Sequence, residues 1–271
     1  MATPNFRHQS NTEVAQVWKG TITTTTNGHT YIGTITDDNG DTGAITYTVV
    51  NPPDSTTTLI AEGFVAAWNA SLNPLVSKLT ASNSSGQVIL TADSAGRPFS
   101  IAASGTGTWS GTGNTTASVD NGDYGQATNW STDAVPTTDD DVTIDTGSTE
   151  INHGLNQSSA AIDVFTVSEG FNGKIGRWED GKPHYLRMDP HSNGSGSTET
   201  TGLPAVALKG SNIAAVNVLS GNNGIAPFVN DTATVGTINV AQEGSTPPTL
   251  EIGSGTTLTT LNAGAGTVTQ K

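Results

Sequence analysis

The chain has 271 residues, enough for two ordinary domains, and a formal net charge of −14. With 24 acidic and only 10 basic residues, it lacks the basic surface that nucleic-acid binding requires, so we expect no nucleic-acid partner. The absence of cysteine excludes disulfides and cysteine metal sites, and no apolar stretch is long enough to span a membrane.

Composition favours a mainly β protein. Hydrophobic residues make up 33% of the chain and glycines number 32, so apolar segments are short. Many Thr, Val and Ile residues stand between Gly and Asn turns, a pattern typical of short strands. Residues 1–16 are polar and lack the apolar run of a cleaved signal peptide.

Residues 1–15 are predicted to form a flexible N-terminal arm. The segment is polar, and Phe6 is its only aromatic residue. Chain ends of this composition are commonly poorly ordered. The alternative is an arm that becomes ordered on a neighbouring subunit.

Residues 16–104 are predicted to form a small α+β module. A helix is expected from about residue 59 to Asn69, with Asp54 and Ser55 as its N-cap and an apolar stripe at helical spacing. The economical arrangement is one antiparallel sheet with this helix on one face. The predicted strands are residues 17–26, 31–36, 45–50, 88–90 and 99–101.

Three phrases within this module resemble a module found in tailed-phage virion proteins. They are AAWN at 66–69, a Ser/Gly hairpin at 82–86, and TADSAGRPF at 91–99. The same phrases occur in large bacterial surface proteins. The resemblance covers about a third of the chain and implies that the module docks onto a particle.

The turn that contains Asp37, Asn39 and Asp41 has the spacing that begins a calcium-binding loop. The sixth and twelfth places of that loop are Thr42 and Thr48, where a calcium loop has Gly and Glu. An Asp- and Gly-rich turn between two strands explains the segment with fewer assumptions. We therefore predict no metal and no cofactor.

Residues 105–122 are rich in Gly, Thr and Ser, with Trp109 as the only bulky side chain. This composition is typical of a linker, which is our prediction for the segment, and the alternative is a long edge strand.

The last sixty residues repeat an apolar–Asn–apolar triplet at 216–218, 238–240 and 261–263. The central residues Asn217, Asn239 and Asn262 are 22 and 23 residues apart. Because strand residues alternate between faces, both apolar residues of a triplet lie on one face. A repeat of this length predicts strand units that bury their apolar faces only by stacking, with the Asn residues in a ladder.

The start of residues 123–271 resembles the N-terminal segment of right-handed β-helices in bacterial and phage proteins. The matching residues are Tyr124, the NWS phrase that contains Trp130, Pro136, and the DDVTI phrase at 140–144. The resemblance implies a short right-handed parallel β-helix over 123–271, and Trp130 is large enough to cover the open end of its stack.

An acidic run at 139–141 lies just before the repeats. In strand alternation Asp139 and Asp141 share a face. A pair of catalytic carboxyls would have to face each other across a substrate, with different pKa values. A solvated strand edge that resists unwanted pairing is the simpler interpretation.

Residues 176–191 interrupt the repeat and concentrate basic and aromatic side chains, which are enriched where binding energy concentrates. We predict a loop that contacts a neighbouring subunit or a host glycan. Its candidate contact residues are Arg177, Trp178, Lys182, His184, Tyr185 and Arg187.

No nucleophile elbow, phosphate loop or dinucleotide fingerprint is present, so no catalytic residue and no enzymatic activity are predicted. Together with the resemblances, this indicates a structural protein of a tailed-phage virion that is assembled in the host cytoplasm. It would form a homo-oligomer, with a trimer favoured, on the major capsid protein or on tail proteins. The alternatives are a carbohydrate-binding or depolymerising β-helix and a bacterial surface adhesin.

Overall fold

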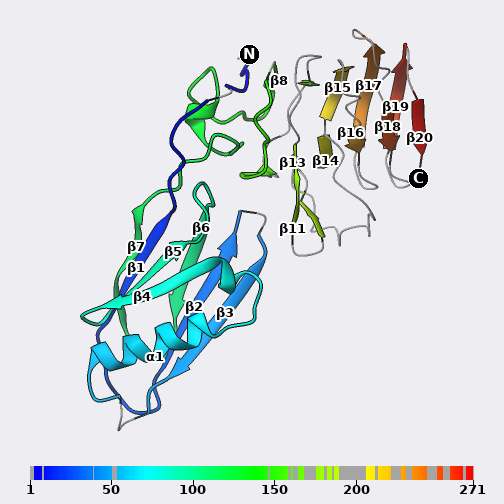
Figure 1. Cartoon of the computed structure of the whole chain (residues 1–271). Helices are drawn as coiled ribbons and strands as arrows, with labels where there is room; N and C mark the ends of the chain where they lie inside the picture. Colours follow the sequence, from blue (N-terminus) through cyan, green and yellow to red (C-terminus); the bar gives the residue numbers. More distant parts are fainter. Residues whose placement is uncertain are drawn as a thin grey trace. The chain divides into compact units, whose positions relative to one another are not determined.

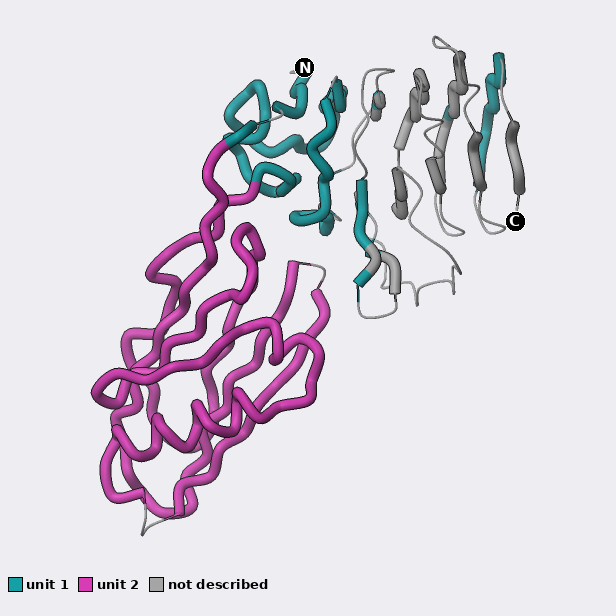
Figure 2. The backbone as a smooth tube through the Cα atoms, in the orientation of Figure 1, with its two compact units in different colours: residues 1–10, 121–271 teal, residues 11–120 magenta. Residues whose placement is uncertain are grey.

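The computed structural model shows a mainly β chain that divides into two compact units (Figure 2). Unit 2 is Asn11–Asp120, and unit 1 combines Met1–Ser10 with Asn121–Lys271. The structure describes residues 3–7, 9–38, 40–50, 54–145, 147–157, 160, 164–167, 175–179, 182–184, 186–188, 206–210, 213–220, 227–229, 234–242, 249–252, 257–264 and 267–270.

Unit 2 contains two antiparallel sheets (Figure 1). The four-stranded sheet has the order β4 (Leu79–Ser84), β5 (Gln87–Ala92), β1 (Val17–Ile22) and β7 (Trp109–Thr116). The three-stranded sheet has the order β3 (Thr42–Thr48), β2 (Thr30–Asp37) and β6 (Phe99–Ser104).

The expectation of a single sheet in this module was wrong. β1 and β2 both alternate buried and half-buried residues, as the sequence pattern indicated, but β1 pairs with β5 and β7 and not with β2. After β1 the chain crosses to the other sheet, and the Tyr31 hydroxyl donates to the Thr24 carbonyl oxygen across this connection (2.7 Å). Period-two alternation identifies a strand with one buried face, but it does not identify the strand's partner.

The single α-helix of the described residues, α1 (Thr57–Asn69), ends where predicted, but its N-cap is Thr56 and not Asp54 or Ser55. The Thr56 hydroxyl accepts the Leu59 N–H (3.2 Å) and caps the helix. Asp54, the expected cap, instead accepts hydrogen bonds from the Tyr47 hydroxyl and the Val50 N–H, both 2.8 Å. None of the helices among the described residues is long and apolar enough to cross a membrane.

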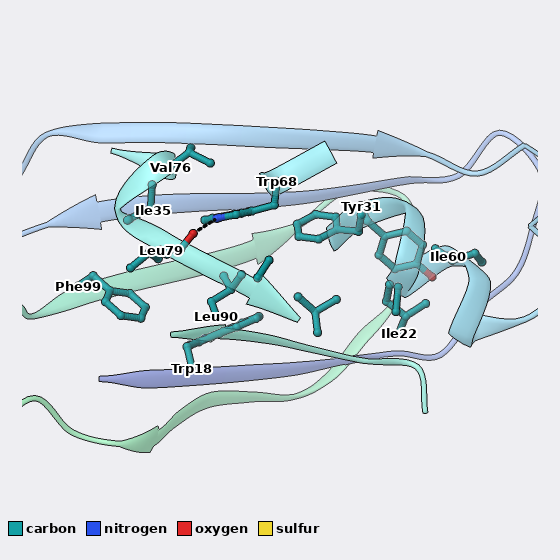
Figure 3. Close-up of a cluster of buried hydrophobic side chains, with 14 of the residues drawn as sticks. Trp18, Ile22, Tyr31, Ile35, Ile60, Trp68, Val76, Leu79, Leu90 and Phe99 are labelled. Atoms are coloured by element: carbon teal, nitrogen blue, oxygen red, sulfur yellow. Dashed lines mark hydrogen bonds between the residues drawn. The ribbon is translucent and has the colours of Figure 1, made fainter. Parts of the chain in front are cut away.

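The core of unit 2 is a cluster of aromatic and aliphatic side chains contributed by α1 and the strands of both sheets (Figure 3). Tyr31, Phe64 and Trp68 are at most 1% exposed. Trp68 also donates its indole N–H to the Leu79 carbonyl oxygen (3.2 Å). A Cβ at Gly33 would lie 2.9 Å from the Phe64 ring, so this glycine allows the helix to approach the sheet closely.

Of the predicted linker at 105–122, residues 105–120 belong to unit 2. They contain β7, the edge strand of the four-stranded sheet, so the alternative interpretation of this segment is the one observed. Trp109 explains the ordering: its ring makes edge-on contacts with Tyr31, Phe64 and Trp18 at centroid distances of 5.3, 5.4 and 6.1 Å.

Tyr47 should make unit 2 sensitive to alkaline pH. Burial, together with the hydrogen bond to the Asp54 carboxylate and its charge, raises the pKa of Tyr47 from 10.0 to about 12. Because the pKa is higher in the folded state, this stabilisation is complete below pH 10 and is lost as pH rises toward 12. Tyr47→Phe should unfold more easily in urea at about pH 8, yet lose less stability between about pH 8 and about pH 11.5 than the parent chain. Equal losses in the two proteins would contradict the assignment.

Unit 1 contains two parallel sheets (Figure 1). Strands β15, β17 and β19 belong to the first and β14, β16, β18 and β20 to the second, so the chain alternates between the sheets along the repeats. The first sheet has the order β19 (Thr257–Ala263), β17 (Thr234–Gln242), β15 (Ile213–Ser220), β10 (Val164–Val167) and β8 (Asp141–Ile144). The second has the order β20 (Thr267–Gln270), β18 (Thr249–Ile252), β16 (Pro227–Val229), β14 (Val206–Gly210), β13 (Leu186–Met188) and β9 (Asn156–Gln157).

The register of the first sheet follows the repeated triplets. Asn217 pairs with Asn239, and Asn239 pairs with Asn262. The same column continues through Thr166 to Thr143 in β8. The repeat interval therefore sets which residues become neighbours on adjacent strands; stacking of the Asn amides stays a prediction.

Within the predicted flexible arm at 1–15, residues 4–7 are instead packed against the rest of unit 1. Pro4 and Phe6 are buried, and Asn5 and Phe6 form bridges with Thr143 and Trp130, respectively. The isolated aromatic residue was the relevant signal, because burial of a phenyl ring offsets the entropy lost on ordering a short segment.

Candidate functional site

The first feature of unit 1 is an aromatic cluster formed by Phe6, Tyr124 and Trp130. The Trp130 ring lies edge-on to both others, with centroid distances of 5.2 Å to Phe6 and 4.6 Å to Tyr124. All three side chains are at most 3% exposed, and the Trp130 indole N–H donates to the Tyr124 carbonyl oxygen (2.8 Å). Trp130 of the NWS phrase is thus fully buried, and its contact with Phe6 was not expected from the sequence.

Complete burial, and secondarily the charge of Asp140, raises the pKa of Tyr124 far above its ordinary value. The hydroxyl therefore remains protonated at physiological pH, which suits a structural residue and not a general base.

A tight crossing of backbones lies next to this cluster. The Asp123 carboxylate accepts the Gly125 N–H (2.7 Å), and the Asn129 side-chain amide donates to the Asp123 carbonyl oxygen (2.9 Å). Gly154 has a φ of +62°, and a Cβ there would lie 2.0 Å from Asp123 Oδ1. Only glycine fits this position, both for its backbone conformation and for the space available.

Arg177 holds a polar cluster that the sequence did not predict. Its Nε donates to Glu179 (2.9 Å), and its Nη1 donates to the Asn152 carbonyl oxygen and approaches His153 Nδ1 (3.3 Å). Since Arg only donates, His153 Nδ1 serves as the acceptor. The Arg177 and Glu179 side chains are only 10% and 16% exposed.

The repeat interval could have revealed this cluster. Ile151 forms a parallel bridge with Ile175, 24 residues later, close to the spacing of the Asn triplets. The same offset joins His153 to Arg177. Extending the spacing of the Asn triplets toward the N-terminus therefore predicts that His153 and Arg177 lie on neighbouring strand units.

The predicted contact loop at 176–191 does not form a single loop. β11 (Arg177–Glu179) and β12 (Lys182–His184) form an antiparallel hairpin, whereas β13 belongs to the second parallel sheet. Arg187 in β13 pairs with Asn156 and Lys209 through the backbone. A loop was expected because the segment is rich in polar residues, and the three-residue strand β13 is too short to show an alternating pattern.

The candidate contact residues consequently differ in their environments. Arg177 is nearly buried within its polar cluster and His184 is 1% exposed, so neither presents the exposed side chain expected of a contact residue. For Trp178, Lys182 and Arg187 the structure describes the backbone alone, and Tyr185 lies outside the described residues. Their role as contacts stays a prediction.

At the proposed calcium-like turn, the backbone itself uses the Asp37 carboxylate. Asp37 Oδ1 accepts the Asp41 N–H (2.9 Å), and the Asp37 N–H donates to the Asp41 carbonyl oxygen (3.0 Å). Asn39 lies outside the described residues. These bonds match the turn that was the simpler interpretation of the segment.

The acidic run does not follow strand alternation. Asp139 has a φ of +66°, and β8 begins only at Asp141. Asp140 accepts the Thr137 N–H (2.9 Å) and so closes a turn before the strand. The expectation that Asp139 and Asp141 share a strand face was wrong, because turn bonding prevails here.

Comparison with known proteins adds no assignment: no family model and no curated protein matches the chain. The Arg177 cluster joins a permanently charged donor to a carboxylate, a carbonyl oxygen and an imidazole, an arrangement suited to holding a hairpin in place.

Replacement of Arg177 should destabilise unit 1. Arg177→Met keeps much of the aliphatic stem but removes the hydrogen bonds to Glu179 and Asn152. In native-state hydrogen exchange, we expect the opening free energy of the hairpin amides to fall by roughly 1.5–3 kcal/mol. Arg7→Met provides a control, since Arg7 makes a more exposed ion pair with Asp133. Equal effects of the two substitutions would contradict the structural role of Arg177.

Proposed function

We propose that the chain is a non-enzymatic structural component of a tailed-phage particle, of the capsid-decoration or head-fibre type. The observation that carries this proposal is the register of the repeats, in which each Asn-centred strand stacks on the next while the chain alternates between two parallel sheets. Stacked strand units of this kind form rigid projections from a surface.

The two parallel sheets are best explained as faces of one short β-helix. Parallel connections between neighbouring strands of a sheet are right-handed in nearly all proteins, so we infer a right-handed helix. Five strands about 4.8 Å apart make a stack of roughly 20 Å, which suits a knob or lobe better than a long fibre. The acidic composition would keep a particle surface soluble.

The expected partners are copies of the same chain and the major capsid protein or tail proteins. A closed trimer is the favoured assembly, and unit 2, which contains the segments that resemble phage modules, is the docking part. The location would be the virion surface, after assembly in the host cytoplasm.

Quantitative mass spectrometry of purified virions tests this function. A capsid decoration should be present in roughly hundreds of copies per particle, because closed shells repeat one site by symmetry. A few copies would indicate a tail component instead, and absence from virions would refute the particle role. Cleavage of a capsular polysaccharide by the purified chain would favour the depolymerase alternative.

A further inference from the structure

The N-terminal segment 4–7, here named the strap, reproduces the repeated strand unit of unit 1. Its Pro4-Asn5-Phe6 sequence has the same apolar–Asn–apolar order as the triplet centred on Asn217. Asn5 forms a parallel bridge with Thr143, the first member of the column that runs on to Asn262. Pro4 and Phe6 are buried and Asn5 is exposed, so the strap adds one strand to the β8 end of the sheet.

Backbone bonds hold the strap along both of its edges. On the β8 side, the Thr143 N–H donates to the Pro4 carbonyl oxygen (3.0 Å) and the Phe6 N–H donates to the Thr143 carbonyl oxygen (2.9 Å). On the other side, the Ser131 N–H donates to the Asn5 carbonyl oxygen (2.9 Å). The strap is thus a β-strand inserted between two backbone segments, one at Thr143 and one at Ser131. We name the position between these two segments the strap site.

Side chains make the strap site selective. The Phe6 ring packs against Trp130, and Arg7 forms an ion pair with Asp133 (2.6 Å) and donates to the Ser131 carbonyl oxygen (2.9 Å). An aromatic residue followed by a cation therefore fits the site, in addition to the strand backbone.

The strap is joined to unit 2 by a short exposed connector. Residues 10–13 are all exposed, and Val14 then pairs with Val119 within unit 2. A change of backbone angles within this connector would release the strap without breaking the pairing of Val14. The connector therefore has the properties of the hinge that strand exchange requires.

We propose that copies of this chain exchange straps, so that the strap of one copy occupies the strap site of another. Exchange preserves every contact of the strap, because the incoming segment is identical to the one that leaves, and only the connector changes. The tethered strap competes at an effective concentration of roughly millimolar, so exchange is favoured where copies are crowded. A particle surface would supply such crowding, but the exchange itself does not depend on a role in phage.

Single cysteines in this cysteine-free chain test the proposal directly. Asn5 and Ser131 are both exposed and lie opposite each other beside the Phe6–Trp130 bridge, at the separation that a disulfide spans. A tagged Asn5→Cys chain is mixed at high concentration with an untagged Ser131→Cys chain and oxidised mildly. The double variant Asn5→Cys/Ser131→Cys is oxidised when dilute, and a tagged Leu72→Cys chain, with its residue 96% exposed, replaces the strap variant as a collision control.

Strap exchange predicts a disulfide-linked heterodimer of Asn5→Cys and Ser131→Cys chains, several-fold more abundant than the heterodimer with Leu72→Cys. The dilute double variant should form an internal bridge. A heterodimer no more abundant than the collision control would overturn the proposal. Failure of the double variant to bridge internally would also overturn it, because the register of Asn5 and Ser131 would then be wrong. Neither result depends on whether the chain is found in virions.

Discussion

Trp130→Ala should lower the opening free energy of the β8 amides by about 3–5 kcal/mol in native-state hydrogen exchange. The substitution leaves a cavity between Phe6 and Tyr124, and it removes the indole donor of the Tyr124 carbonyl oxygen. Phe6 would lose its principal ring contact. The strap amides should therefore exchange their hydrogens with solvent early, and the edge of β8 should open at the same time.

Leu72→Ala is the control for this measurement, because Leu72 is 96% exposed and its truncation should leave the β8 amides unchanged. A loss below about 1 kcal/mol in Trp130→Ala would show that the aromatic cluster does not hold the N-terminal end of the sheet together.

Trp68→Ala should cost a similar amount, about 3–5 kcal/mol, at the amides of β4 and β5. Trp68 is 1% exposed, contacts Phe64 within the core and donates to Leu79. The cavity would open between α1 and the sheets of unit 2. Leu59→Ala on the same helix is the matched control, because Leu59 is 38% exposed and should cost far less.

The effect of Trp68→Ala should be confined to unit 2, since the core cluster that contains Trp68 is built from unit 2 residues. An equal loss of protection at the β8 amides of unit 1 would contradict this division of the chain. Circular dichroism before exchange would show whether the variant is folded.

The sequence predicted those elements whose signals are local. The apolar stripe that contains Phe64 and Trp68 identified the helix, and alternation identified β1 and β2. The Asn repeat identified the register of β15, β17 and β19. Equivalent residues of successive repeats lie side by side on adjacent strands, so the interval between them gives the pairing.

Features that depend on contacts far apart in sequence were missed. Nothing near Phe6 shows that it packs against a residue more than a hundred positions later, and nothing near β1 shows that β5 is its neighbour. The cap of α1 was displaced from Asp54 to Thr56 because the Asp54 carboxylate is occupied by Tyr47. In each case the sequence allowed more than one local structure of similar energy, and a tertiary contact determined which of them formed.

The candidate site was predicted only in outline. The clustering of basic and aromatic residues drew attention to 176–191, but composition cannot distinguish an exposed Arg from one that ties its hairpin to Asn152 and His153. The repeat offset that joins His153 to Arg177 was the usable signal.

A single spin-label distance tests most directly whether unit 1 is one continuous stack of strands. Labels at Thr143→Cys and Asn262→Cys lie four strand spacings apart along one column, so electron–electron resonance should give a narrow distribution centred near about 20 Å. A broad distribution, or one centred beyond about 35 Å, would mean that β8 and β19 do not belong to the same stack.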